Sequence, residues 1–193
     1  MPDHGELFQK QLIEYGACTF GRMKTGSLFR ILRKDIPNSE ECMCYFDRQC
    51  SPFGYHICVL QENKEGCLVY VYNAHKLEYI LSEPSIQIFL SDFGYDVFDV
   101  DTSLQRLKQR LHEQSEFPHE IGIFLGFPLQ DVQAFITPQK KCKLVGYWKV
   151  YGNVKKFQKV FYRYDCCTKT FVACLNQGET FVQILKKCNE LTH

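Results

Sequence analysis

The chain has 193 residues, of which 45% are hydrophobic and 15% aromatic, so it has ample material for a buried core and is not disordered throughout. Its 23 Lys and Arg residues nearly balance its 22 Asp and Glu residues, giving a net charge of +1. This balance removes an electrostatic argument for nucleic acid or an anionic membrane, and we expect neither as a partner.

The cysteine content favours a reducing compartment. There are eleven cysteines, an odd number, and several lie inside apolar runs, where cysteine behaves as a small hydrophobe. The N-terminal residues lack a basic segment followed by an apolar run, and the sequence has no uncharged apolar run of about 18 residues. We therefore expect a cytoplasmic protein with reduced thiols.

Residues 1–54 are predicted to form a helical N-terminal part. An apolar stripe from Leu7 predicts a first helix that ends at Gly16. A glycine-bearing loop then leads into a short apolar element at 28–32. Pro37 and the polar residues that follow it mark the start of a second helix.

Residues 55–116 are predicted to form a hairpin followed by helices. The strands, 55–60 and 67–73, are apolar on both faces, which indicates a covered sheet. Gly66 in the connecting loop suits a left-handed turn residue. The expected helices are 74–81, 85–93 and one beginning near Thr102.

Residues 117–193 are predicted to contain a strand–helix–strand–helix block. Short helices begin at Pro118 and Pro128, and strands are expected at 141–151 and 170–175. A helix capped by Asn153 separates those strands, so a parallel crossover is the expected geometry, and a final helix completes the chain. The fold class is α/β (mixed α+β): a single domain, with helices packed on a small mixed sheet of about four strands.

Three glycines in this block are expected to serve the backbone. Gly122 and Gly146 lie among large apolar residues, where a missing side chain permits close packing, and Gly126 suits a left-handed helix C-cap. Gly66, expected to be exposed, provides a comparison.

A thiol nucleophile is one candidate chemistry. Cys18 lies in the glycine-bearing region after the first helix, and a cysteine nucleophile needs a histidine within hydrogen-bond reach, for which His119 is the candidate. An inert buried thiol is the alternative interpretation of Cys18.

Ligand binding is the other candidate chemistry, and its predicted residues fall into three groups. His119 and Glu120 lie in a first helical turn beside free backbone amides, and solvated capping residues are the simpler interpretation of this pair. Lys24 and Thr25 offer an ammonium and a hydroxyl to an anion, without a P-loop pattern. The third group lies on the strand around the single Trp, on the face opposite to it. That face either presents an aromatic surface to a planar ligand or merely covers the core, and its residues are Tyr147, Lys149 and Tyr151.

Metal binding by the protein's own residues is not expected, and the sequence leaves the identity of any cofactor open. Cys42 and Cys44 point to nearly opposite sides of a helix, and the adjacent pair Cys166 and Cys167 lacks a C-x-x-C partner. The segment HEIGI at 119–123 lacks the second histidine of a zinc-protease motif.

Two segments, FPHEIGIFLGFPLQDVQAFI and CKLVGYWKVYGNVKKFQKVFYRYDCC, resemble a bacterial domain-of-unknown-function family, thirty-seven ninety-three in its series. KTGSLF near the start and the hairpin HICVL…CLVYVYN extend the resemblance over nearly the whole chain. The resemblance implies a soluble bacterial protein and no particular activity. Its members carry a His-Cys pair just upstream of the KTGSLF-like motif, where this chain has Tyr15 and Gly16 and a cysteine at Cys18.

The function expected from these observations is that of an accessory protein that binds a small ligand, a cofactor or a redox partner protein. The alternative is a thiol-dependent hydrolase or transferase that uses Cys18 and His119.

Overall fold

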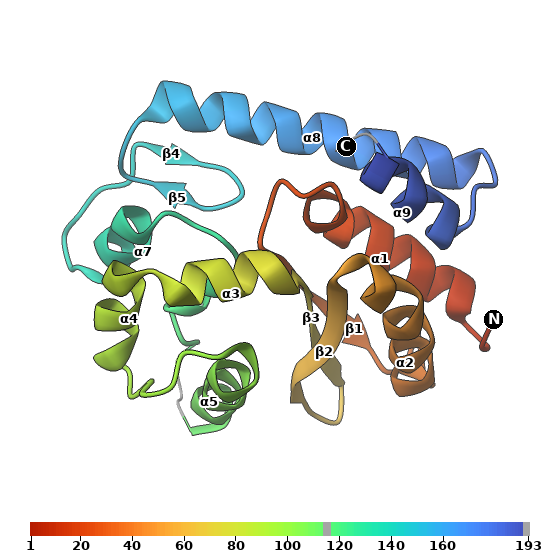
Figure 1. Cartoon of the computed structure of the whole chain (residues 1–193), viewed down its shortest axis with the longest axis horizontal. Helices are drawn as coiled ribbons and strands as arrows, with labels where there is room; N and C mark the ends of the chain where they lie inside the picture. Colours follow the sequence, from red (N-terminus) through yellow and green to blue (C-terminus); the bar gives the residue numbers. More distant parts are fainter. Residues whose placement is uncertain (114–116, 191–193) are drawn as a thin grey trace.

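A three-stranded antiparallel sheet lies at the centre of the computed structural model, which describes residues 1–113 and 117–190 (Figure 1). Its strands are β1 (Gly26–Leu32), β2 (Tyr55–Glu62) and β3 (Gly66–Asn73), in the order β1-β3-β2. All eight residues of β3 are buried. The prediction of a covered hairpin is therefore confirmed for its second strand, whose β-branched and aromatic residues pack on both faces.

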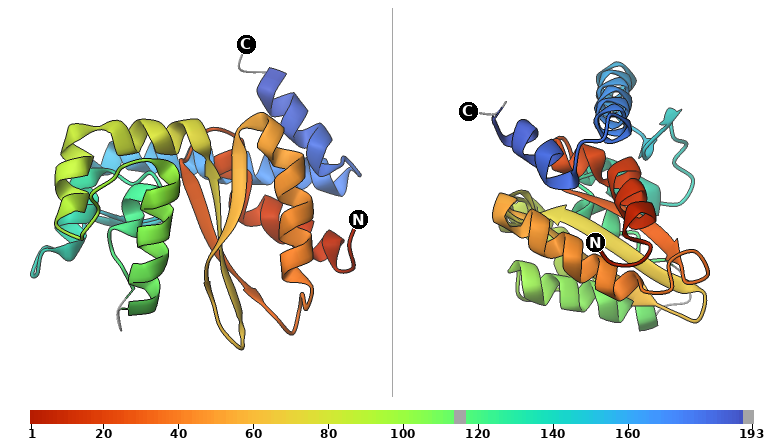
Figure 2. Two further views of the ribbon diagram at one scale, coloured as in Figure 1. Left: turned by 60° about the horizontal axis from the view of Figure 1, so that its bottom comes forward. Right: turned by 90° about the vertical axis from the view of Figure 1, so that its right-hand side faces the viewer.

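The two faces of the sheet build two separate cores, because successive side chains of a strand point to opposite sides. On β3, Val69 and Val71 belong to a first core with α1, α2 and α9, whereas Tyr70 and Tyr72 belong to a second core with residues of α3 to α7. Figures 1 and 2 show these two groups of helices on either side of the sheet. The helices are α1 (Gly5–Phe20), α2 (Ser39–Cys50), the short 3₁₀ helix η1 (Ser51–Phe53), α3 (Ala74–Ser82), α4 (Pro84–Ser91), α5 (Val100–Glu113), α6 (Ile121–Phe124), α7 (Leu129–Ile136), α8 (Val154–Asn176) and α9 (Phe181–Glu190).

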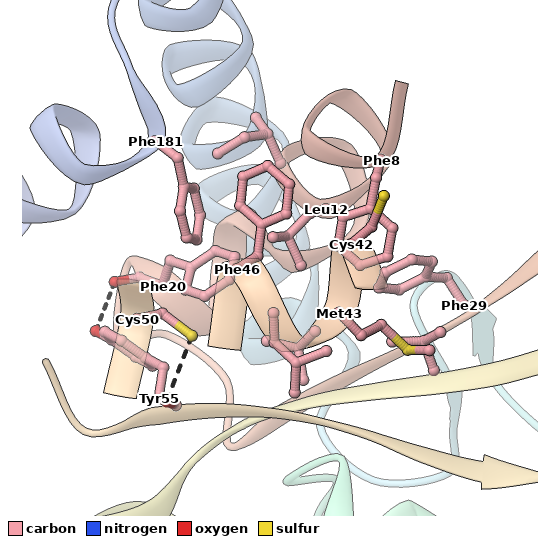
Figure 3. Close-up of a cluster of buried hydrophobic side chains, with 14 of the residues drawn as sticks. Phe8, Leu12, Phe20, Phe29, Cys42, Met43, Phe46, Cys50, Tyr55 and Phe181 are labelled. Atoms are coloured by element: carbon pink, nitrogen blue, oxygen red, sulfur yellow. Dashed lines mark hydrogen bonds between the residues drawn. The ribbon is translucent and has the colours of Figure 1, made fainter. Parts of the chain in front are cut away.

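Aromatic rings dominate the first core (Figure 3). Phe46 of α2 stacks on Phe8 of α1 with ring centroids 5.3 Å apart. The buried Tyr55 hydroxyl donates a hydrogen bond of 2.7 Å to the carbonyl of Phe20, so its polar end is satisfied. Cys50 is fully buried here and donates to the Tyr55 carbonyl at 3.4 Å. Such cysteines pack as small apolar residues.

The predicted strand at 170–175 is wrong, because those residues belong to the long helix α8. The buried positions Phe161, Tyr164 and Phe171 form one helical stripe that continues past the expected end of the helix. The expected parallel crossover is therefore also wrong. The strand predicted at 141–151 is instead a small antiparallel hairpin of β4 (Leu144–Val145) and β5 (Lys149–Val150).

Helix α8 lies along one side of the molecule, over the β4–β5 hairpin at its N-terminal end and beside α1 further along (Figure 1). Asn153 caps it as predicted, accepting a hydrogen bond of 3.0 Å from the Lys156 amide. The outer face of its first turns is basic and exposed, through Lys155, Lys159 and Arg163 among others.

Two glycine predictions in the N-terminal half need correction. Gly16 does not end the first helix, which continues to Phe20. Gly66 is buried and has no positive φ, and a Cβ there would lie 1.9 Å from the carbonyl oxygen of Ile31. The turn is formed instead by Asn63, whose side chain accepts hydrogen bonds from the amides of Glu65 and Gly66.

The predicted fold class is confirmed, with helices packed on a small sheet in a single compact domain. Across the two described ranges, no helix combines the length and apolarity needed to cross a bilayer.

Candidate functional site

An apolar pocket of about 430 Å³ opens between α6, α7 and the β4–β5 hairpin. Its volume lies in the range of small-molecule sites. Phe117 and Phe135 are 47% and 40% exposed, which is unusual for rings of this size. The lining residues are Phe117, His119, Ile121, Gly122, Leu125, Phe127, Asp131, Val132, Phe135, Trp148 and Lys149.

The buried carboxylate of Asp131 fixes one wall of this pocket. Its Oδ2 accepts a hydrogen bond of 2.8 Å from Trp148 Nε1, and its Oδ1 accepts from the amides of Tyr151 and Gly152 at 2.9 and 3.2 Å. These bonds tie the hairpin to α7 and leave the carboxylate well satisfied. Asp131 is therefore a positioning residue for the Trp148 ring.

Two of the predicted ligand-binding residues, His119 and Lys149, line this pocket. The His119 ring stands edge-on to Phe135, with ring centroids 4.8 Å apart. The Lys149 ammonium lies 4.9 Å from the centroid of the same ring. Among the described residues it forms no ion pair. The pocket thus combines apolar walls with an imidazole and an ammonium group.

Glu120 and Thr25 have different surroundings from those expected. Glu120 is fully buried and forms an ion pair with Arg110 of α5, and it accepts a hydrogen bond of 3.5 Å from the Tyr95 hydroxyl. Thr25 is 5% exposed and packs against Gly126. Neither lines the pocket, and both connect elements of the fold.

A second polar group lies where the last turn of α1 meets the middle of α8, and we call its residues Cys18, Lys24, Tyr147, Cys167 and Thr168 the thiol cluster. Cys18 Sγ lies 3.5 Å from the Tyr164 carbonyl oxygen and 3.6 Å from Thr168 Oγ1. The Cys167 thiol donates a hydrogen bond of 3.6 Å to the carbonyl of Ala17, the residue that precedes Cys18.

Hydrogen bonding and charge both act on the Cys18 thiol. Its pKa is lowered to about 7, first by the hydrogen bond from Cys167 and further by Thr168 and the Lys24 ammonium, while burial opposes the shift. Burial lowers the pKa of Lys24 to about 8, and the Cys18 thiolate opposes this change. The hydrogen bond with Cys18 and burial raise the pKa of Cys167. The two thiols are thus unequal, and Cys18 is the more acidic.

Aromatic side chains separate the thiol cluster from the pocket. The Lys24 ammonium lies 5.7 Å from the Phe127 centroid and 6.0 Å from that of Tyr147. Phe127 also lines the pocket and stacks on Trp148 at 4.9 Å. The Tyr147 hydroxyl donates a hydrogen bond of 2.9 Å to Asp165. Phe127 is therefore in contact with both sites.

The described contacts of Cys18 and of His119 do not include each other. Lys24 and Tyr147 belong with Cys18, whereas Lys149 belongs with His119. Tyr151 is held through its backbone amide by Asp131. The candidate residues thus divide between two neighbouring sites.

Sequence reasoning missed Asp131, Phe127 and Cys167 as site residues. Asp131 is an acid in a short amphipathic helix near the chain's one Trp, and that pattern was a usable signal. In the sequence, Cys167 stands out only as the neighbour of Cys166, a pairing that suggests a metal ligand rather than a thiol partner. Its nearness to Cys18 depends on the packing of α1 against α8, which no local pattern predicts. Within the described ranges, no three His, Cys, Asp or Glu residues cluster in a way that would hold a metal ion.

The fold and these two sites define a mixed helix-and-sheet protein with an apolar pocket and a neighbouring thiol pair. Comparison of the sequence with family models matches residues 12–185 to the family described as "Protein of unknown function (DUF3793)", and the chain belongs to that family. No curated protein and no solved structure matches it.

Proposed function

We propose that this protein binds a small, flat, mostly apolar molecule or cofactor that carries an acidic group. The observation that supports the proposal is the pocket of about 430 Å³, with its apolar walls and the Lys149 ammonium and His119 ring among its lining residues. Such a pocket excludes water from a ring system and leaves a few polar groups to set its orientation.

The pocket walls suit an aromatic ring. Phe127, Phe135 and Trp148 come from three different segments and offer ring faces and edges, which favour stacked or edge-on contacts. The Asp131 carboxylate is already engaged by three donors, so it orients Trp148 rather than receiving a cationic ligand.

The ligand's acidic group is proposed from the charge of Lys149. Its ammonium is exposed, lies over Phe135 and has no carboxylate partner among the described residues. A ligand carboxylate would supply that partner, and hydrogen bonds to charged groups contribute about 1.5–3 kcal/mol.

The test uses 2-naphthoic acid and its neutral analogue 2-naphthamide as probes. Trp148 is the chain's one tryptophan, so quenching of its fluorescence reports binding in this pocket. We expect the acid to bind more tightly than the amide, and Lys149→Gln to weaken the acid about tenfold, which corresponds to 1.4 kcal/mol.

Lys143→Gln is the matched control, because Lys143 is exposed beside the same hairpin and does not line the pocket. It should leave binding of the acid unchanged. Failure of both probes to change the fluorescence or the melting temperature would contradict the proposal.

The alternative of a thiol-dependent hydrolase or transferase has narrower support. The acidic thiol of Cys18 favours it, but the charged neighbour of that thiol is Lys24, and His119 lines the pocket. A substrate would have to reach Cys18, which is 3% exposed. We therefore place ligand binding ahead of this alternative.

We further propose that the protein is bacterial, that it is cytoplasmic, and that its protein partner is a redox protein. All eleven cysteines are free thiols in the structure, which suits a reducing compartment. Alkylation in intact host cells followed by mass spectrometry should modify the accessible thiols and find no disulfide. A disulfide present in unstressed cells would argue against this location.

A further inference from the structure

The thiol cluster provides an inference that is independent of the pocket ligand. Cys18 comes from α1 and Cys167 from α8, 149 positions apart in the sequence. The Cys18 sulfur lies 3.6 Å from Thr168 Oγ1, and the Cys167 thiol donates to the carbonyl of Ala17 at 3.6 Å. Each sulfur thus lies against the residue next to the other cysteine, which places the two thiols close together.

The cluster also separates the roles of its two sulfurs. The pKa of Cys18 is lowered to about 7 by hydrogen bonding with Cys167 and Thr168 and by the Lys24 ammonium, which makes the thiolate accessible at neutral pH. Cys167 keeps its proton to a higher pH, because hydrogen bonding with Cys18 and partial burial raise its pKa. Cys18 is thus suited to be the attacking thiolate, and Cys167 is suited to react afterwards with the oxidised Cys18 sulfur.

The position of the cluster permits a small oxidant to approach. Cys18 itself is 3% exposed, but Lys24, Cys167 and Thr168 are only half-buried and Tyr147 is 39% exposed. Cys18 therefore lies directly beneath the surface. A hydroperoxide of nearly the size of water is the class of oxidant that suits such a site.

We propose that Cys18 and Cys167 form a peroxide-reactive dithiol, in which Cys18 attacks the peroxide and Cys167 then closes a disulfide. The Cys18 thiolate attacks one oxygen of hydrogen peroxide, the O–O bond breaks, and Cys18 becomes a sulfenic acid. The departing hydroxide takes a proton from the Lys24 ammonium and leaves as water.

In the second step, Cys167 attacks the Cys18 sulfur. The S–O bond breaks as the S–S bond forms, and the hydroxyl leaves with the Cys167 proton as a second water. Two thiols are oxidised and both peroxide oxygens are reduced. The Lys24 amine then regains a proton from solvent.

The experiment treats the reduced full-length protein with one equivalent of hydrogen peroxide at pH 7.5. Samples are quenched by alkylation, digested without reductant and analysed by mass spectrometry. We expect a Cys18–Cys167 disulfide as the first product. Oxidation that begins at the exposed Cys44 or Cys166, or Cys18 reacting no faster than the deeply buried Cys50, would overturn the proposal.

Variants test the separate roles. Cys167→Ser should accumulate a sulfenic acid on Cys18 that dimedone traps, and Lys24→Gln should slow the first step several-fold. Cys166→Ser, adjacent to Cys167 and exposed, should leave the rate unchanged. An unchanged rate in Lys24→Gln would overturn the role of Lys24, and a wild-type pH–rate profile without a fall below about pH 7 would overturn the attack by a Cys18 thiolate. The wild-type product map decides the proposal even if a variant does not fold.

Discussion

Gly126 has a φ of 78°, and a Cβ placed there would lie 2.7 Å from Thr25 Oγ1. Gly178 has a similar φ of 85° but nothing within 4 Å of such a Cβ. At either position, an L-residue in the left-handed backbone conformation lowers the stability of the fold by about 1–2 kcal/mol. At Gly126 alone, the close contact of the added Cβ with Thr25 destabilises the fold further.

We therefore expect Gly178→Ala to lower the free energy of unfolding by about 1 kcal/mol and Gly126→Ala to lower it by clearly more. Urea unfolding of both variants measures the difference. Equal losses would show that Thr25 yields to the added methyl group without cost.

The Cys18 thiol leads to a prediction about pH. Its pKa falls from 9.0 in the unfolded chain to about 7 in the folded protein. Between these values the unfolded state holds a proton that the folded state has released, so stability rises with pH from about 7 to 9. The contribution is lost as pH falls through 7.

Thiolate absorbance at 240 nm provides the direct measurement. The difference in absorbance between the wild type and Cys18→Ser should titrate with a midpoint near pH 7. The same subtraction with Cys50→Ser should show no step below pH 9, because burial raises the pKa of Cys50. A Cys18 step near pH 9 would remove the basis for an activated thiol.

Single residues also show the limit of local sequence reasoning. His119 and Glu120 are adjacent and were predicted to share a ligand site, yet His119 lines the pocket and Glu120 is buried against Arg110. The residue types were visible in the sequence. The side to which each points depends on where α5 packs.

At the scale of elements, the β4–β5 hairpin illustrates how little backbone pairing a segment needs when side chains hold it. Its strands are two residues each. Asp131 of α7 supplies three further hydrogen bonds to Trp148, Tyr151 and Gly152. The hairpin is thus fixed by one carboxylate as much as by its own ladder.

Replacing Asp131 by Asn should therefore cost about 1–3 kcal/mol, because an amide cannot accept from every donor that now faces the carboxylate. The emission of Trp148 should shift at the same time, since its indole loses a charged partner. Asp92→Asn, at an exposed position, is the control and should change neither. Unaltered stability and emission in Asp131→Asn would show that water replaces these bonds.

Helix α8 explains the main error in predicting elements. The segment TFVACL was predicted as a strand because it is short, apolar and rich in β-branched and aromatic residues. Yet Phe161, Tyr164 and Phe171 keep one helical stripe through it, and α1 packs beside that stripe. The helical period, followed across the whole segment, indicates a continuous helix.

At the scale of the molecule, the central sheet was predictable in part. An apolar sequence on both faces of β3 correctly indicated cover on both sides. The pairing of β1 with β3 was not predictable from the sequence. It joins residues some 40 positions apart, and no turn or local pattern connects the two strands. The same limit hid the meeting of Cys18 with Cys167.

The basic face of α8 has a consequence for the molecule as a whole. Residues 140–169 contain nine Lys or Arg residues and one Asp, a net charge of +8, so the rest of a chain of charge +1 carries −7. All nine basic residues are exposed, and α8 with its hairpin lies along one side in Figure 1.

Although its net charge is only +1, this protein should therefore be retained on a cation exchanger at neutral pH and low salt. Charge reversal at Lys155, Lys159 and Arg163 should abolish most of that retention. Reversal at Lys10, Lys34 and Lys64, which are also exposed, changes the net charge equally and should have a smaller effect. Equal effects would show that net charge alone governs retention.

In electrostatic terms, the molecule has almost no monopole but is unevenly charged, with +8 on residues 140–169 and −7 on the rest, so it behaves more as a dipole. A monopole draws partners in from all directions, whereas a dipole exerts a torque. Within a Debye length of about 8 Å at physiological salt, an anionic surface would turn this protein before touching it. The side that arrives first would be α8, with the β4–β5 hairpin and its pocket alongside.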